Sequence, residues 1–101
     1  MELRHIRYFL AVADTRSFTR AAERLHVTQP TLSHQIKQLE SQVGTVLFER
    51  GTKDVDLTEA GRLFKPYCER ILKEIEASTL AISELEGLMR GRLRMAVFHS
   101  L

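Results

Sequence analysis

The sequence of 101 residues contains little cysteine, since Cys68 is its only one. Because this cysteine has no partner in the chain for a disulfide bond, the sequence fits a reducing compartment, and we expect a cytoplasmic protein. No run of about 18 apolar residues occurs, and charges interrupt the apolar residues of the N-terminal segment MELRHIRYFL. The sequence therefore predicts neither a membrane span nor a signal peptide.

The excess of positive charge is also small, because 15 lysines and arginines accompany 13 acidic residues and give a formal net charge of +2. Hydrophobic residues make up 44% of the chain, which is enough for the core of one small domain with an appendage. A mildly basic chain is compatible with a nucleic-acid partner but does not require one. The placement of the charges along the sequence must therefore decide whether a nucleic acid is the partner.

The sequence also lacks the residue groupings of a catalytic site. Its four histidines fall in different expected elements, at His5, His26, His34 and His99. No nucleophile stands beside a base, no glycine-rich phosphate loop occurs, and no pair of carboxylates has a useful spacing. We therefore predict that the chain is not an enzyme and holds no cofactor or metal ion of its own.

The most informative stretch, residues 17–40, has the pattern of two short helices joined by a tight turn. Ser17 can cap the first helix and Thr28 the second. Ala21 and Ala22 allow the two helices to approach closely at a steep angle. A supporting helix is predicted just before the pair by the apolar stripe of Leu3, Ile6, Phe9, Leu10 and Ala13.

The second helix of the pair has two different faces. Its apolar face has helical spacing and comprises Leu32, Ile36, Leu39 and Val43. The opposite face carries small, hydrogen-bonding or cationic side chains, namely Gln29, Pro30, Thr31, Ser33, His34, Lys37 and Ser41. This face suits the major groove of DNA, but on this pattern alone an ordinary solvated helix pair is an equal alternative.

The segment after the pair predicts a small hairpin. Gly44 has the character of a helix C-cap, and apolar residues alternate in TVLFERGTKDVDLT on either side of a turn at residues 51–54. Arg50 and Lys53 lie at or near this turn, where a basic side chain can reach a phosphate or a narrow minor groove. For Lys53 the alternative is an edge hairpin kept soluble by charge, which two nearby aspartates support.

A long amphipathic helix is predicted from Glu59, with Thr58 as its cap. Apolar residues recur in steps of four and three and form a heptad seam of Phe64, Cys68, Ile71, Ile75, Ser78, Ile82, Leu85 and Met89. At about 1.5 Å per residue the helix is too long for so small a domain to cover. We expect the seam to join two copies of the chain, although its first three residues can instead pack within the domain. The rival interpretation is an interaction module whose long helix joins a different protein.

A helix pair followed by a hairpin is the plan of a mainly α, winged helix-turn-helix domain with a two-stranded wing. The residues RYFLAVAD, SFTRAAERLHVTQPTLSHQIKQLESQVGTVLFER and VDLTEAG resemble the amino-terminal DNA-binding domain of LysR-type transcriptional regulators, and the resemblance extends over residues 3–97. Its most specific motifs are Ser17-Phe18 with Ala21-Ala22, Gln29-Pro30 with Ser33, Leu39-Glu40, Leu47-Phe48 with Arg50, and Leu57-Thr58 with Gly61.

The resemblance implies sequence-specific binding of double-stranded DNA by a bacterial regulator. The implied base contacts are Gln29, Pro30, Thr31, Ser33 and His34. We expect phosphate contacts from Ser17, Thr28, Lys37 and Arg50, and Lys53 is implied as the wing residue at the minor groove. Relatives often carry arginine or glutamine at position 34, so the histidine here puts a bidentate contact to guanine in doubt.

The resemblance also implies a division of the chain. Residues 1–58 are the DNA-binding domain, residues 59–89 the linker helix that pairs two subunits antiparallel, and residues 90–101 a hinge and the start of an effector-binding domain, where RLRMAVF alternates as a strand. The expected assembly is a homodimer, or a tetramer for a full-length regulator, on an interrupted inverted repeat. A small-molecule effector is expected for the further domain. Within the family, RHIRYFLAVAD and TRAAERLHVTQPTLSHQIKQLE are similar to cyanate-utilisation regulators.

Overall fold

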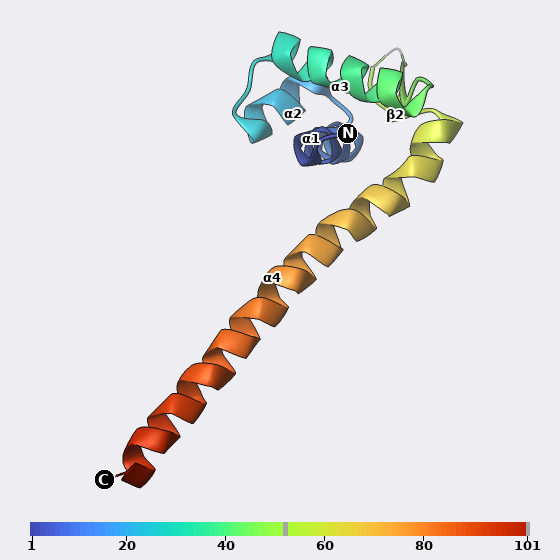
Figure 1. Ribbon diagram of the computed structural model, residues 1–101. Coiled ribbons are helices and arrows are strands. Elements are labelled where there is room, and N and C mark those ends of the chain that lie inside the picture. The colour runs from blue at the N-terminus through green and yellow to red at the C-terminus, as the bar shows by residue number, and fades with distance from the viewer. Residues whose placement is uncertain (52, 101) are drawn as a thin grey trace. The chain divides into compact units, whose positions relative to one another are not determined.

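A computed structural model describes residues 1–51 and 53–100, with side chains up to residue 95 (Figure 1). Within this range the elements are α1 Leu3–Thr15, α2 Phe18–Leu25, α3 Gln29–Val43, β1 Phe48–Arg50, β2 Val55–Leu57 and α4 Glu59–Ser100. The chain divides into a compact unit, Met1–Glu69, and a helical unit, Arg70–Leu101. The predicted mainly α, winged helix-turn-helix fold is confirmed.

The ends of the helices are set by the predicted capping residues. The Ser17 hydroxyl accepts the Arg20 backbone N–H at 3.1 Å, and the Thr58 hydroxyl accepts that of Gly61 at 3.0 Å. At the other end of α3, Gly44 has a φ of 90°, a left-handed conformation that glycine adopts without strain. Side-chain oxygens and this glycine therefore satisfy backbone groups that a helix leaves unpaired at its ends.

The turns on either side of α2 are tight although they contain no glycine. Arg16 and His26, which follow α1 and α2, have φ values of 57° and 58°. The backbone N–H of each donates to a carbonyl of the preceding helix, at 2.8 Å from Arg16 to Val12 and at 3.2 Å from His26 to Glu23. A left-handed residue other than glycine costs about 1–2 kcal/mol, so packing elsewhere holds these turns.

The core of the compact unit lies where α1, α3 and the wing meet (Figure 1). Three of the four residues of the predicted apolar face of α3 are buried, Leu32, Ile36 and Leu39, while Val43 is half-buried. Phe9 of α1 is fully buried, and its ring centroid lies 5.2 Å from that of Phe48 and 5.1 Å from that of Phe64. Aromatic contacts at these distances join α1 to β1 and to the first turns of α4.

The wing is a two-stranded antiparallel sheet, as predicted, with Phe48 opposite Leu57 and Arg50 opposite Val55. The Gly51 N–H donates to the Asp54 carbonyl at 2.8 Å and closes the turn. Thr52 of the predicted turn lies outside the described residues.

Two contacts fix the wing's first strand and the start of α4. The Glu40 carboxylate of α3 accepts the Leu47 N–H at 2.6 Å and the Phe48 N–H at 3.4 Å. The first turn of α4 approaches Leu47 so closely that a Cβ at Gly61 would lie 2.3 Å from its carbonyl oxygen. Only glycine fits this position without a shift of the backbone.

The strand predicted over residues 92–98 is wrong, because α4 continues through Gly87 and Gly91 as far as Ser100. A strand needs a neighbouring strand for its backbone hydrogen bonds, whereas a helix pairs these groups within itself. The sheet found among the described residues has two strands, both in the wing. Among those residues no helix combines the length and the apolar character that crossing a membrane requires.

Candidate nucleic-acid interface

The polar face of α3 is open to solvent, as the sequence pattern predicts. Its exposed residues include Gln29, Pro30, Thr31, His34, Lys37 and Ser41, while Ser33 is half-buried. None of these side chains is acidic, so this face can approach a polyanion without charge repulsion. The buried stripe of α3 fixes the helix against α1 and α2 and so holds the polar face on a rigid support.

The N-terminal end of α3 is organised by hydrogen bonds between its threonines. The Thr28 hydroxyl accepts the Thr31 backbone N–H at 3.3 Å and donates to the Thr31 hydroxyl at 2.9 Å. Thr31 therefore keeps its own O–H as a free donor and its methyl group as an apolar contact. A hydroxyl reads a base edge or a phosphate, and a methyl group packs against that of thymine.

His34 is paired with another residue of the same helix. Its Nε2 lies 3.2 Å from the amide nitrogen of Gln38. The donor and acceptor roles in this contact depend on the tautomer of the ring. Because Nε2 is engaged within the helix, only Nδ1 is left for another contact, and a bidentate contact to guanine does not fit this position.

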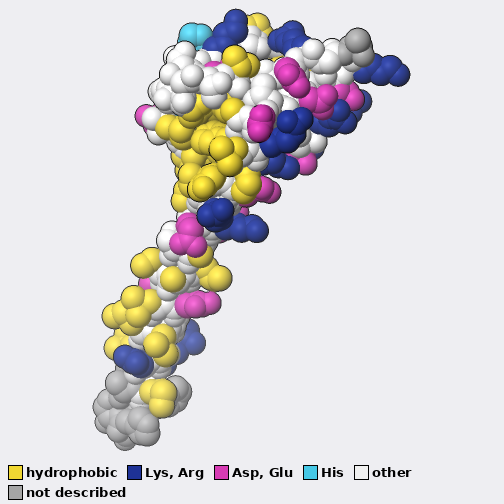
Figure 2. Space-filling model, turned by 90° about the vertical axis from the view of Figure 1, so that its right-hand side faces the viewer, with side chains coloured by type: hydrophobic (Ala, Val, Ile, Leu, Met, Phe, Trp, Pro, Cys, Tyr) yellow, Lys and Arg dark blue, Asp and Glu magenta, His cyan; other side chains and the backbone are white. Residues whose placement is uncertain are grey.

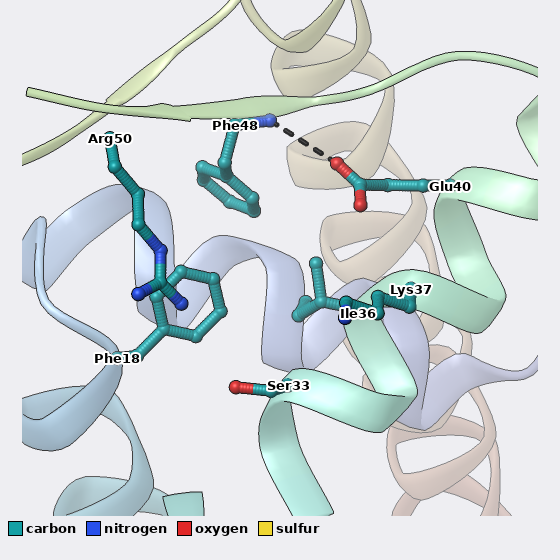
Figure 3. Close-up of a pocket in the computed structure, with 7 residues that line it drawn as sticks. All are labelled: Phe18, Ser33, Ile36, Lys37, Glu40, Phe48 and Arg50. Atoms are coloured by element: carbon teal, nitrogen blue, oxygen red, sulfur yellow. Dashed lines mark hydrogen bonds between the residues drawn. The ribbon is translucent and has the colours of Figure 1, made fainter. Parts of the chain in front are cut away.

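A hollow connects the polar face of α3 to the wing (Figure 3). It is lined by Phe18, Ser33, Ile36, Lys37, Glu40, Phe48 and Arg50. The Arg50 guanidinium carbon lies 5.3 Å from the centroid of the Phe18 ring, a cation–π contact that holds this charge in place. The structure therefore brings three predicted contact residues, Ser33, Lys37 and Arg50, to one site.

A second hollow lies between the N-termini of α2 and α3 and the wing. It is lined by Arg16, Ser17, Phe18, Thr19, Gln29, Arg50, Gly51, Lys53, Asp54 and Val55. Four of the predicted DNA contacts line this hollow although they are spread over 37 positions of the sequence, namely Ser17, Gln29, Arg50 and Lys53. The positive end of a helix dipole adds to the charge of the two basic side chains. His34 lines neither hollow.

Three contributors to this surface were missed by the sequence prediction. The ring of Phe18 supports Arg50. Arg16 pairs with two aspartates of the wing. Arg4 donates to the Gln35 side chain at 3.2 Å and so joins α1 to α3. No signal in the sequence reveals these pairs, because each joins residues far apart in the chain.

The predicted dimer seam divides between the two units. Phe64 contacts Phe9, and Cys68 is fully buried within the compact unit. A side chain without exposed surface has none to bury against a partner, so the assignment of Cys68 to the dimer interface is corrected to a core position. Burial, followed by the negative charge of Glu69, raises the pKa of the Cys68 thiol to about 11.

The remaining seam residues present apolar surface along α4. Ile71, Ile82 and Leu85 are 38%, 60% and 52% exposed, and Ile75 is half-buried. The Ser78 hydroxyl donates to the Ile75 carbonyl at 2.6 Å, so this polar group is satisfied within the helix and fits an apolar seam. Figure 2 shows hydrophobic side chains repeated along α4 between charged ones.

The titratable groups do not assemble into a metal site within the described residues. His5 is buried in α1, His26 ends α2 and His34 lies on α3. The side chain of His99 lies outside the described ones. The Asp14 carboxyl accepts a hydrogen bond from Arg24 and is held by its charge, which lowers its pKa.

Comparison with known proteins identifies the domain. Residues 3–62 match the family described as "Bacterial regulatory helix-turn-helix protein, lysR family". The regulator BudR of Klebsiella aerogenes is 52% identical over 91 residues, which are 90% of this chain and 62% of that protein. A RuBisCO operon transcriptional regulator of Allochromatium vinosum is 46% identical over 97 residues, 96% of this chain and 32% of that protein. The chain thus spans about two thirds or less of these relatives.

Solved structures give the same result. The DNA-binding domain of BenM in complex with benA site 1 DNA is 41% identical, with a TM-score of 0.81 over 84% of this chain and 96% of that one. The DNA-binding domain of CbnR in complex with DNA is 42% identical, with a TM-score of 0.74 over 77% of this chain and 90% of that one. Both neighbours are bound to DNA.

The relatives are named as transcriptional regulators, which confirms the prediction that the chain is not an enzyme. Neither BudR nor the RuBisCO regulator is named for cyanate, and that finer resemblance stays a prediction. The match covers more than half of the chain and includes the helix pair, the wing and the start of α4. The chain therefore belongs to the LysR family of bacterial helix-turn-helix regulators and carries that family's winged DNA-binding domain.

Proposed function

We propose that the chain is the DNA-reading part of a homodimeric, cytoplasmic transcriptional regulator that recognises an interrupted inverted repeat. In this proposal α3 enters the major groove and the wing contacts the adjacent minor groove. The observation that carries the proposal is the meeting of the polar face of α3 with Arg50 and Lys53 of the wing across two adjoining hollows. One continuous surface can then follow a DNA backbone between its two grooves.

The sequence preference resides in the polar face of α3, in the exposed Gln29, Pro30, Thr31 and His34 and the half-buried Ser33. The Gln29 amide can form two hydrogen bonds with an adenine edge. Thr31 offers a methyl group to thymine, and Ser33 serves a base or the backbone. His34 contributes the ring nitrogen that Gln38 does not engage, Nδ1, to a contact with a base edge.

The larger share of the binding energy comes from phosphate contacts by Ser17, Thr28, Lys37 and Arg50, together with Lys53 in the wing. These groups carry little sequence information but fix the orientation of α3 in the groove. The stacking of Arg50 on Phe18 supports this role, since a guanidinium already held in place loses less freedom on binding.

The dimer forms through the exposed seam of α4, by Ile71, Ile75, Ser78, Ile82 and Leu85, with Phe64 at its edge. A two-fold antiparallel pairing would place the same seam against itself and bury the apolar strip of both copies. A tetramer and a small-molecule effector belong to the full-length regulator in this proposal. The division at residues 58 and 89, with a hinge after it, is part of the same proposal.

The test is a titration of DNA binding against salt concentration, with duplex fragments from upstream of the chain's own gene and with random duplexes. We expect a preference for certain fragments and a steep fall of affinity with salt. Lys37→Ala should weaken binding to every sequence and lower the salt slope by about one unit. Binding that neither prefers a sequence nor depends on salt would contradict the proposal and favour a module that joins another protein through α4.

A further inference from the structure

Arg16 is connected to the second strand of the wing and to Asp54 just before it by three interactions. Its backbone carbonyl accepts the Val55 N–H at 3.0 Å. One guanidinium nitrogen donates to the Asp56 carboxylate at 2.5 Å, and the other lies 3.8 Å from that of Asp54. The left-handed backbone of Arg16, with a φ of 57°, turns the chain at this point between α1 and α2. The residue that turns the chain also holds β2.

The first strand of the wing is held by Glu40 and by the packing of Phe48, whereas Arg16 contacts the second strand. The strands of the wing have three residues each, and an isolated two-stranded hairpin of this size is marginally stable in water. Asp56 lies directly opposite Glu49 in the sheet, and like charges at such a position repel each other. The Arg16 guanidinium compensates for this repulsion from outside the hairpin and so supports β2.

The position of the wing also affects the predicted DNA contacts. Arg16, Arg50 and Lys53 line one hollow together with Gln29, the first residue of α3. A shift of β2 would move the turn that carries Lys53 relative to α3. The two aspartates that dilute the positive charge of the wing are also partly neutralised by Arg16.

We propose that Arg16 is a positioning residue that sets the wing at the correct place beside α3, so that Lys53 reaches DNA when α3 reads its bases. The inference rests on the proposed function for its effect on DNA, while its effect on the wing is independent of it. Arg16 acts through Asp56 and β2 and makes no DNA contact of its own.

The variant chosen is Arg16→Gly, because glycine adopts the left-handed conformation of this position and preserves the turn. The matched control is Arg24→Gln, which removes a similarly exposed arginine, paired with Asp14 at 2.5 Å and remote in sequence from the wing. Both surface pairs contribute little to global stability, so the melting temperatures of both variants should lie within a few degrees of the wild type.

The first measurement is amide hydrogen exchange of residues 48–57 in the free protein. We expect faster exchange of the wing amides in Arg16→Gly, with unchanged exchange in Arg24→Gln. Unchanged exchange in Arg16→Gly would overturn the inference whether or not the protein binds DNA. The proposed function fails separately, if the wild-type chain shows no salt-dependent binding.

The second measurement is a double-mutant cycle with Lys53→Ala, on a duplex that the wild-type protein protects from cleavage. In the wild-type background Lys53→Ala should lower the affinity about fivefold at physiological salt, the share of one counterion. In the Arg16→Gly background we expect less than about a twofold effect, because the wing no longer delivers Lys53. A full fivefold loss in the Arg16→Gly background would contradict the positioning role of Arg16.

Discussion

The compact unit and the helical unit differ in where their apolar side chains lie. In the compact unit Phe9, Leu32 and Leu39 are fully buried, whereas in the helical unit Ile82 and Leu85 expose more than half of their surface, 60% and 52%. Both units are built mainly from amphipathic helices. The compact unit thus buries its own core, while the helical unit presents an exposed apolar strip.

The surfaces that the two units offer to partners differ in the same way. The compact unit exposes the hydrogen-bonding and cationic face of α3 together with Arg50 and Lys53 of the wing. Such a surface suits a polyanion, whose binding is electrostatic and falls with salt. The helical unit offers repeated leucine and isoleucine side chains, which suit a second helix. The proposed DNA binding and the proposed dimerisation can therefore be tested one at a time.

The largest expected effect is that of Leu85→Glu, which places a charge at the C-terminal end of the exposed seam of α4. We expect the chain to become monomeric and its apparent affinity for a two-site duplex to fall about 100-fold or more, because the second half-site loses its tethered partner. The compact unit should keep its melting temperature. Sedimentation equilibrium and fluorescence anisotropy measure the two effects.

The control is Ser83→Glu, which adds the same charge two residues away, off the seam. It should remain dimeric and bind as the wild type does. If Leu85→Glu stays dimeric, the seam is not the dimer interface.

Gln29→Ala tests the compact unit's surface without touching its core. We expect a loss of about 1–3 kcal/mol on the preferred sequence and relaxed preference at one base position, because a side-chain amide that reads a base edge is removed. Gln42→Ala, at the far end of the same helix, is the control. An equal loss on preferred and random duplexes would remove Gln29 from the base contacts.

Glu40→Ala tests a hydrogen bond that stabilises the compact unit. It leaves the Leu47 N–H without its carboxylate acceptor, and we expect the free energy of unfolding to fall by about 1–2 kcal/mol. The melting temperature should drop by about 5–10 °C, as measured by circular dichroism. Glu23→Ala, at an exposed position of α2, should have little effect. Equal melting temperatures for the two variants would show that this bond contributes nothing to stability.

The smallest effect at neutral pH concerns Cys68. Because its pKa is raised from 9.0 to about 11 in the folded chain, the unfolded chain loses this proton first as pH rises. The free energy of unfolding is therefore unaffected below pH 9 and falls between pH 9 and about 11. Urea titrations at several pH values measure this fall, and Cys68→Ala should reduce it. An unchanged pH dependence in the variant would assign the fall to other groups.

The local features of the fold could be predicted because single residues determine them. Ser17, Thr28 and Thr58 act as caps through hydrogen bonds that reach only three residues along the chain. The buried stripe of α3 follows from helical periodicity. The strand predicted over residues 92–98 was wrong because a short alternating run is compatible with a helix when no partner strand is adjacent.

The contacts that shape the candidate site are long-range and leave no local pattern. Arg16 and Asp56 are 40 positions apart in the chain, and a left-handed arginine has no sequence signal of the kind that glycine gives. The exposed residues of α3 could be selected from periodicity and resemblance. The folded chain alone reveals how the wing packs. This packing brings four predicted contact residues to one hollow, namely Ser17, Gln29, Arg50 and Lys53.

The central claim is that two DNA-reading units are held together by the seam of α4. A hydroxyl-radical footprint of the chain on DNA upstream of its own gene tests this claim most directly. We expect two protected half-sites of inverted sequence, with centres about one helical turn or a whole number of turns apart, and protection that disappears when about five base pairs are inserted between them. A single protected half-site that survives this insertion unchanged would contradict the claim.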